Sequence, residues 1–264
     1  MSSTTYETKP SGKICPECGK EIRFIIVPPF GMEIPDPCEC QLARERAEYA
    51  AGIERGKVKI RAVMRRVAGL RPRWNEYTFS SIRPRQGQER VYKLAQAYSE
   101  KFYRLKGEGL ILSGSTGCGK TMLAAAIANA VIDITGIDDY EAERVGRGAL
   151  PRESSPVRMA STVDLMAQIK NCYGSGGAQE LIAAYQSAQL AILDDVGAEK
   201  PSDWVIERLF EIIDRRYSDR LPIIITTNQT PGEMEKRLGS RIVDRLNEVC
   251  VQADIAAPSQ RAHR

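Results

Sequence analysis

A glycine-rich octapeptide between two apolar segments constrains this chain more than any other feature of its sequence. Residues 114–121 read Gly-Ser-Thr-Gly-Cys-Gly-Lys-Thr, which is the Gly-x4-Gly-Lys-Thr pattern of a phosphate-binding P-loop. An apolar run at 110–112 precedes the octapeptide, and apolar residues at helical spacing follow it as far as Ile134. The sequence therefore predicts a strand, a tight loop and a helix in that order.

Each residue type in the octapeptide has a physical role in binding phosphate. Glycines let the backbone N–H groups turn inward around phosphate oxygens, and the helix N-terminus adds positive potential. Lys120 counters the charge of the β- and γ-phosphates, and Thr121 offers a hydroxyl to Mg²⁺. The alternative is a glycine-rich turn that binds nothing. The predicted nucleotide-binding residues are Gly114, Ser115, Thr116, Gly117, Cys118, Gly119, Lys120 and Thr121.

Two further apolar runs end in polar residues that suit nucleotide chemistry. Residues 190–193 lead into Asp194 and Asp195, and residues 223–227 lead into Asn228. In a parallel sheet buried on both faces, such residues lie at the carboxyl edge, where ligands bind. We expect Asp194 to hold Mg²⁺, Asp195 to orient or deprotonate the attacking water, and Asn228 to hold that water near the γ-phosphate. The alternatives are an acidic loop start after 193 and a simple turn at Asn228.

Four cysteines crowd the first forty residues. Cys15 and Cys18 form a Cys-x-x-Cys knuckle followed by glycine, and Cys38 and Cys40 follow after nineteen intervening residues. This spacing suits tetrahedral Zn²⁺, and an all-thiolate shell is typical of a structural site. So short a module has little core, so the metal would supply much of its folding energy. Free or redox-active thiols are the alternative.

A basic segment separates the cysteines from the P-loop region. Residues 42–74 contain ten Lys and Arg residues but only three Glu residues. This excess of positive charge indicates either a solvated helix face or a contact surface for nucleic acid or an acidic partner. We predict a zinc-binding domain over 1–45, a basic helical linker over 46–73 and a nucleotide-binding domain over 74–264. Residues 135–156 are predicted to form an insertion loop.

Length and composition fit an ordinary soluble protein with one large and one small domain. The chain of 264 residues has no run near the ~20 apolar residues that would span a bilayer, and its N-terminus lacks the apolar segment of a signal peptide. We therefore expect a cytoplasmic protein with no membrane partner, whose seven cysteines are thiols or metal ligands. The single histidine, His263, argues against a Ser-His-Asp or Cys-His relay.

Taken in order, these motifs resemble the AAA+ ATPase domain of bacterial and phage replicative helicase loaders of the DnaC/DnaI type, and the related IstB transposition ATPases. The resemblance implies an α/β fold, an AAA+ P-loop NTPase with a parallel sheet flanked by helices, preceded by the small zinc-binding domain. The matching stretches are Tyr77–Phe79, Gly114–Ala128, Leu193–Glu199, Ile213–Tyr217, Ile225–Asn228 and Gly239–Leu246.

The resemblance also implies roles for arginines. Asn228 matches sensor 1, and Arg245 matches the arginine finger that reaches the γ-phosphate of a neighbouring subunit, with Arg241 as the rival candidate. The alternative is that both arginines are ordinary surface helix residues. Arg261 resembles a sensor 2 arginine, although few residues follow Arg245, so the lid is reduced or absent. A finger supplied by a neighbour implies self-association in the presence of ATP.

The implied function is ATP-dependent loading of the hexameric replicative helicase onto single-stranded DNA, with slow ATP hydrolysis stimulated by DNA or partner. The cysteine-bearing part resembles the helicase-docking domain of zinc-containing loaders. Lys170 and Tyr173 lie where this family contacts single-stranded DNA, although a tyrosine at such a position can instead pack in the core. One alternative is a transposase accessory ATPase that binds duplex DNA. The other is an ATP-switched binding module in which Asp195, shorter than glutamate, does not support hydrolysis.

Overall fold

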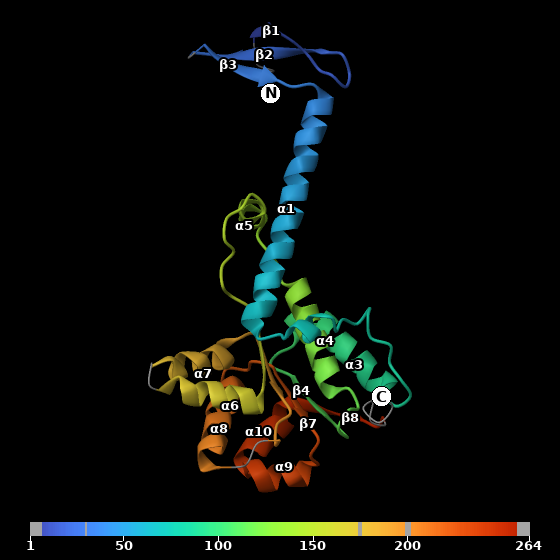
Figure 1. The fold of residues 1–264 in the computed structure, drawn as a ribbon, viewed down its shortest axis with the longest axis vertical. Helices are drawn as coiled ribbons and strands as arrows, with labels where there is room; N and C mark the ends of the chain where they lie inside the picture. Colours follow the sequence, from blue (N-terminus) through green and yellow to red (C-terminus); the bar gives the residue numbers. More distant parts are fainter. Residues whose placement is uncertain (1–6, 30, 174–175, 199–201, 258–264) are drawn as a thin grey trace. The chain divides into compact units, whose positions relative to one another are not determined.

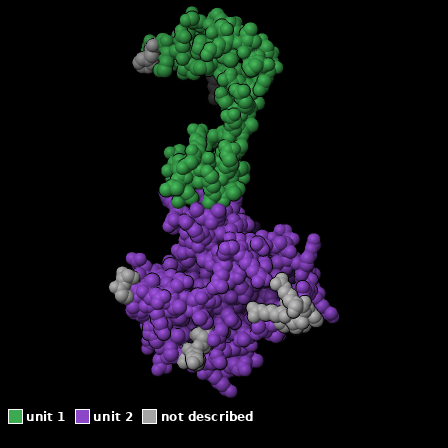
Figure 2. Space-filling model, viewed as in Figure 1, with its two compact units in different colours: residues 1–59, 137–151 green, residues 60–136, 152–264 purple. Residues whose placement is uncertain are grey.

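The computed structural model describes residues 7–29, 31–173, 176–198 and 202–257. The chain divides into two compact units, the first formed by residues 1–59 and 137–151 and the second by 60–136 and 152–264 (Figure 2). Among the described residues, no single helix is long and apolar enough to cross a membrane. The domain boundaries at residues 45 and 73 stay a prediction.

The first unit contains a small antiparallel sheet of three strands in the order β1-β2-β3. The strands are β1 (Glu7–Ile14), β2 (Glu21–Val27) and β3 (Met32–Asp36) (Figure 1). Strand β2 contains the apolar residues at 22 and 24–27. Within the described residues from 7 to 38, Cys15 is the only buried side chain. This module therefore has almost no apolar core of its own.

Helix α1 (Glu39–Ala68) begins in the first unit and ends in the second. Within the first unit it packs against α5 (Asp139–Gly146), which begins where the Asp138 side chain accepts a hydrogen bond from the Glu141 N–H. A Cβ added to Gly56 would lie 1.6 Å from the Ala142 carbonyl oxygen, and one added to Gly146 would lie 2.0 Å from the Gly52 carbonyl oxygen. Small residues four apart on each helix thus let the two backbones touch.

Helix α5 lies inside the segment 135–156 that was predicted to be a loop, and that prediction was wrong over 139–146. The polar composition of the segment hid the helix, because its two buried residues, Ala142 and Val145, gain their partners only through tertiary contact. Gly52 and Gly56, which would weaken an isolated helix, lie in the contact between α1 and α5.

The second unit is built on a five-stranded sheet in the order β5-β6-β7-β4-β8, and every neighbouring pair is parallel. Helices cover both faces (Figure 1), with α3 and α4 in one apolar cluster and α6 to α10 in the other. This confirms the predicted α/β class. The strands are β4 (Gly109–Gly114), β5 (Val157–Ser161), β6 (Leu190–Asp194), β7 (Ile223–Thr227) and β8 (Cys250–Ile255). The helices are α2 (Pro72–Asn75), α3 (Glu89–Glu100), α4 (Lys120–Ile134), α6 (Thr162–Asn171), α7 (Gly177–Ser187), α8 (Asp203–Ser218), α9 (Pro231–Leu238) and α10 (Ser240–Val249).

The three central strands are the ones that the sequence predicted most clearly, because a strand buried on both faces is a continuous apolar run. In β4, Leu110 and Leu112 pack with α4, whereas Ile111 packs in the other cluster. The edge strand β8 was not predicted. Its buried and exposed residues are mixed, as suits an edge strand, so no apolar run marks it.

Candidate functional site

The loop between β4 and α4 has the backbone conformation of a P-loop. Three of its glycines, Gly114, Gly117 and Gly119, have positive φ angles of 139°, 83° and 108°. A Cβ at Gly114 would also lie 2.7 Å from the carbonyl oxygen of Ile255 on β8. Glycine is therefore required at Gly114 both by backbone conformation and by the close approach of the edge strand.

The ammonium group of Lys120 lies inside this loop. Its Nζ donates hydrogen bonds to the carbonyl oxygens of Gly114, at 2.8 Å, and Ser115, at 3.0 Å. Gln88, which is buried, supports the loop from outside through a hydrogen bond of 2.6 Å from its Nε2 to the Cys118 carbonyl oxygen. Gln88 was not predicted, because its position just before α3 belongs to no motif.

Thr121 and Asp194 were predicted to share a Mg²⁺ ion, and the structure brings them into direct contact. The Thr121 Oγ1 donates to both carboxylate oxygens of Asp194, at 2.9 and 3.0 Å. Asp194 is 5% exposed, and this burial raises the pKa of its carboxyl, while hydrogen bonds from Thr226 and Thr121 oppose the rise. A hydroxyl and a carboxylate are hard oxygen donors of the kind that Mg²⁺ prefers, so this pair fits the ion.

A second hydroxyl holds the same carboxylate and was not predicted. Thr226 on β7 is fully buried, and its Oγ1 donates to Asp194 Oδ1 at 2.6 Å. The same Oγ1 accepts from the backbone N–H of Asp195 at 2.8 Å. Thr226 therefore fixes both the side chain of one acid and the backbone of the next. The signal in the sequence was the pair of threonines, Thr226 and Thr227, that ends an apolar run.

Asp195 and Asn228 follow the carboxyl ends of the neighbouring strands β6 and β7. Asp195 has a φ of 58°, a left-handed conformation that is uncommon for a residue other than glycine. Both side chains are exposed, and neither hydrogen-bonds to another side chain in the described part of the chain. They thus lie free at the edge where Asp194 is buried.

The two candidate finger arginines have different surroundings on α10. The Arg245 Nε lies 2.6 Å from Asp214 Oδ1 in an ion pair, and its guanidinium lies 4.9 Å from the centre of the Phe210 ring. Arg241 is exposed, and its side chain forms no ion pair or hydrogen bond with the described residues. Arg261 lies outside the described residues. Arg241 is therefore the more accessible of the two guanidiniums on this helix.

Lys170 and Tyr173 lie in a small aromatic group at the surface of the second unit. Tyr173 is half exposed, so the alternative that it packs in the core was wrong. Its hydroxyl accepts a hydrogen bond of 3.2 Å from the Trp204 indole N–H, and the Lys170 ammonium lies 4.9 Å from the Trp204 ring centre. Trp204 thus joins the two predicted residues in one cation and aromatic cluster.

The four N-terminal cysteines meet at one point. The Sγ atoms of Cys15, Cys18, Cys38 and Cys40 all lie within 4.8 Å of one another, and all four are free thiols. In a tetrahedral site with Zn–S bonds of about 2.3 Å, the sulfur atoms are roughly 3.8 Å apart, so the cluster fits the ion. Hydrogen bonds from the backbone N–H groups of Cys18 and Glu17 lower the pKa of the Cys15 thiol to about 7, which favours the thiolate that binds metal.

Much of the basic segment is paired within the chain itself. In the first unit Lys57 lies 2.9 Å from Asp139. In the second unit, the remaining ion pairs join Arg61 and Arg65 to Asp133, Arg66 to Glu153 and Arg71 to Asp164. These pairs account for half of the ten basic residues and indicate that the segment serves internal contacts as well as solvent.

The comparisons with known proteins agree with this geometry. A profile of the family described as IstB-like ATP binding protein matches residues 53–264. The replicative helicase loader DnaC of Escherichia coli K12 is 29% identical over 184 residues, which span 68% of this chain and 66%, just under two thirds, of that relative. DnaI, a replicative helicase loader of Bacillus subtilis, is 27% identical over 131 residues, 49% of this chain and 36% of that protein. A crystal structure of the DnaC helicase loader has a TM-score of 0.57 at 25% identity, covering 70% of this chain and 99% of that one.

Proposed function

Because the chain belongs to the IstB-like ATP binding protein family, we propose that it is an AAA+ ATPase that loads a replicative DNA helicase onto single-stranded DNA in the cytoplasm. The family match confirms the resemblance that the motifs indicated. The relatives named DnaC and DnaI support a helicase as the client. The observation that carries the proposal is the contact of Thr121 with Asp194 beside a P-loop that holds the Lys120 ammonium.

In this proposal the loop residues 114–121 bind the phosphates of ATP, and Lys120 turns from its carbonyl partners to the β- and γ-phosphates. Thr121 and Asp194 would hold Mg²⁺, and the ion would supply charge neutralisation for the phosphates when bound. Asp195 orients or deprotonates the attacking water, and Asn228 holds that water in place. The exposure of both side chains supports these roles, because each must reach solvent that enters with the nucleotide.

An arginine of a neighbouring subunit completes the site, so chains associate with one another when ATP is bound and hydrolysis alone is slow. The accessibility of Arg241 supports it as this arginine. Arg245 remains its rival, although it would first have to leave its ion pair with Asp214. No role is proposed for Arg261.

The first unit binds the hexameric helicase, and its sheet is held together by Zn²⁺ on Cys15, Cys18, Cys38 and Cys40. The convergence of the four thiols supports this part of the proposal. The surface group of Lys170, Tyr173 and Trp204 contacts single-stranded DNA by phosphate pairing and base stacking, for which its exposure is suited.

The test is co-purification with the replicative helicase of the source organism, with and without ATP. We expect the wild-type chain to retain the helicase, and Lys120→Ala to lose its ATP affinity and any ATP dependence of the complex. The zinc-ligand variant Cys15→Ser should lose the helicase but keep ATP binding. If the wild-type chain does not bind the helicase but binds duplex DNA in the presence of ATP, the loader assignment fails and the transposase accessory function replaces it.

Hydrolysis is tested separately by steady-state ATP turnover in the presence of helicase and single-stranded DNA. Asp195→Asn should reduce the stimulated rate to background while leaving ATP affinity intact. Equal rates for wild type and Asp195→Asn, both near background, would instead favour an ATP-switched binding module that does not hydrolyse.

A further inference from the structure

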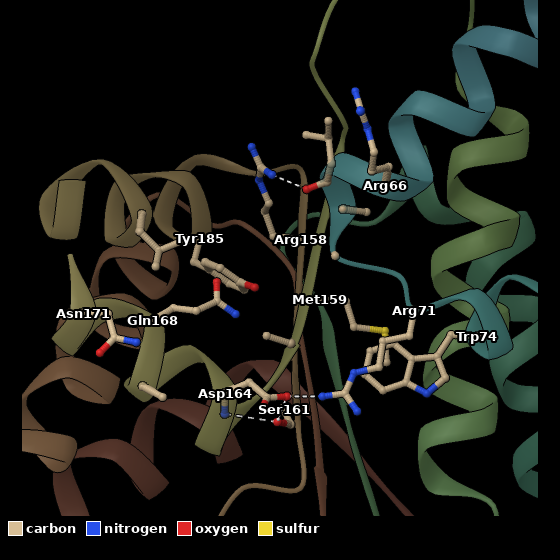
Figure 3. Close-up of a pocket in the computed structure, with 16 residues that line it drawn as sticks. Arg66, Arg71, Trp74, Arg158, Met159, Ser161, Asp164, Gln168, Asn171 and Tyr185 are labelled. Carbon is tan, nitrogen blue, oxygen red and sulfur yellow. Dashed lines mark hydrogen bonds and ion pairs between the residues drawn. The ribbon is translucent and has the colours of Figure 1, made fainter.

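A cavity lies in the unit that carries the P-loop, away from the P-loop itself. Its volume is about 570 Å³, and it is lined by the end of α1, the segment that follows, β5, α6 and α7 (Figure 3). None of the residues 114–121, Asp194, Asp195 or Asn228 lines it. Its size falls within the ~300–1,000 Å³ of typical small-molecule sites. The ATPase reaction therefore leaves this cavity without a role.

The lining of the cavity carries more positive than negative charge. The lining residues include three arginines, Arg66, Arg71 and Arg158, and one acid, Asp164. Arg66 pairs with Glu153 and Arg158 donates to the Val67 carbonyl oxygen, so Arg71 is the arginine that contacts Asp164. Arg71 forms an ion pair with Asp164, and its guanidinium lies 5.1 Å from the centre of the Trp74 ring. Figure 3 shows Arg71 and Asp164 pointing toward one another across the cavity. The Asp164 carboxylate thus shows that an anionic group fits beside Arg71 in this cavity.

One hydroxyl in the lining has no hydrogen-bond partner within the described residues and opens to the cavity. Tyr185 on α7 is 5% exposed, and its hydroxyl forms no hydrogen bond within the described residues, although its ring borders the cavity (Figure 3). Burial raises the pKa of this hydroxyl, so at neutral pH it keeps its proton and can donate it. The Tyr185 hydroxyl can therefore donate to a ligand oxygen or nitrogen in the cavity.

The position of Tyr185 is fixed by the chain around it. The fully buried Arg216 donates a hydrogen bond of 2.7 Å from Nη1 to the Tyr185 carbonyl oxygen, and a second of 2.8 Å to that of Ala188. These bonds satisfy carbonyls at the C-terminal end of α7, which helical hydrogen bonds leave free. The Tyr185 ring is thus presented by a well-anchored helix end.

Helix α6 contributes two carboxamides to the same cavity. Gln168 lies four residues after Asp164, and Asn171 lies three residues after Gln168. The three residues therefore share one side of α6. Neither carboxamide has a hydrogen-bond partner within the described residues. A carboxamide offers a donor and an acceptor side by side, which matches the edge of a nucleobase.

We propose that this cavity binds a nucleoside phosphate at a site distinct from the P-loop. The phosphate replaces Asp164 as the partner of Arg71, because a phosphate carries more charge and more acceptor oxygens than a carboxylate. Gln168 and Asn171 bind the edge of the base, and the Tyr185 hydroxyl donates to the ligand. The Trp74 ring, once Arg71 turns to the phosphate, offers its face to the base or sugar.

The probe for this site is adenosine monophosphate without Mg²⁺, because it lacks the β- and γ-phosphates that Lys120 would engage. The chain has two tryptophans, so Trp74 is the only tryptophan in the variant Trp204→Phe. We expect adenosine monophosphate to change the Trp74 fluorescence of this variant in a saturable way. In equilibrium dialysis of the full-length chain, Arg71→Gln and Gln168→Ala should each weaken binding, the former about tenfold or more because it removes a charge-assisted hydrogen bond.

Arg215→Gln is the matched control, because Arg215 is also an exposed arginine in an ion pair, 2.6 Å from Asp219, and does not line the cavity. It should leave binding unchanged. The proposal is overturned if no saturable change occurs, if inorganic phosphate binds as tightly as the nucleotide, or if only a single-stranded oligonucleotide binds. If Lys120→Ala loses adenosine monophosphate binding, the probe binds at the P-loop, and the cavity proposal is overturned. If Lys120→Ala loses ATP binding but keeps adenosine monophosphate binding, the result supports the ATPase proposal and leaves the cavity proposal standing.

Discussion

Replacing Thr226 by valine removes one hydroxyl and keeps the shape of the side chain. In the folded protein this hydroxyl donates to Asp194 Oδ1 at 2.6 Å and accepts from the Asp195 N–H at 2.8 Å. Thr226→Val therefore leaves the buried carboxylate with Thr121 as its remaining side-chain donor among the described residues. Thr226 would touch neither ATP nor water in the proposed reaction, so it is a positioning residue that acts through the two acids.

The expected loss follows from the charge of the acceptor. A hydrogen bond to a charged group contributes about 1.5–3 kcal/mol, which corresponds to about a tenfold to hundredfold change in an equilibrium constant. Because Asp194 is expected to engage the nucleotide only through Mg²⁺, the affinity for ATP with Mg²⁺ should fall by this factor. The affinity for ATP in the presence of a chelator should change little.

The assay is a titration of ATP with and without Mg²⁺, repeated for three variants. Thr226→Ser restores the hydroxyl and should restore the Mg²⁺-dependent affinity. Thr227→Val is the matched control, because Thr227 is also buried on β7 but its hydroxyl donates to the Val196 carbonyl oxygen, at 2.8 Å, rather than to an acid. The reasoning is refuted if Thr226→Val binds ATP with Mg²⁺ as tightly as the wild type, or if Thr227→Val loses as much.

The same variant should change how stability depends on pH. Burial raises the pKa of Asp194 above its ordinary value of 3.8, so in the window above 3.8 the folded chain binds more protons than the unfolded chain. The contribution of Asp194 to the free energy of unfolding therefore falls as pH rises through that window. Without the Thr226 hydroxyl the pKa rises further, so the stability deficit of Thr226→Val should be smallest near about pH 4 and largest at about pH 8 in urea unfolding.

Three further changes test other parts of the molecule. Cys15→Ser or chelation should unfold the N-terminal sheet without changing ATP affinity, and hydrogen exchange that stays slow in a zinc-free sample would contradict the metal site. Gly56→Leu should free α5 and destabilise the first unit by about 2 kcal/mol or more, seen as faster exchange in α5, whereas Gly136→Ala, with nothing within 4 Å of its Cβ, should not. Arg241→Ala should keep ATP binding but lose partner-stimulated hydrolysis; if Arg245→Ala alone shows that loss, Arg245 is the finger.

The parts of the fold that could be predicted from sequence are those whose residues carry their own signal. The strands β4, β6 and β7 are apolar runs. The start of α6 is indicated by Ser161, whose side chain accepts a hydrogen bond from the Asp164 N–H, as expected of a helix N-cap. By contrast α5 and β8 are stabilised by contacts with distant segments, and β1 is mostly polar. No local pattern records such contacts.

In the candidate site, too, some contacts could be predicted from sequence motifs and others could not. The contact of Thr121 with Asp194 follows from two motifs whose order fixes the geometry. The role of Thr226 does not, because a threonine within a strand is equally explained by its β-branched shape. The ion pair of Arg245 with Asp214 joins residues 31 positions apart on different helices, which no motif relates.

The contact between α1 and α5 has a consequence for the history of the sequence. Gly56 tolerates no side chain only because the Ala142 carbonyl oxygen lies 1.6 Å from its Cβ position, and Gly146 tolerates none because the Gly52 carbonyl oxygen lies 2.0 Å from its own. Gly56 and Gly146 are therefore under one shared constraint, and homologues that keep the insertion should keep glycine at both positions. Homologues that have lost the insertion should have drifted toward alanine, leucine or lysine at 56, since these residues favour helix and nothing would then oppose them.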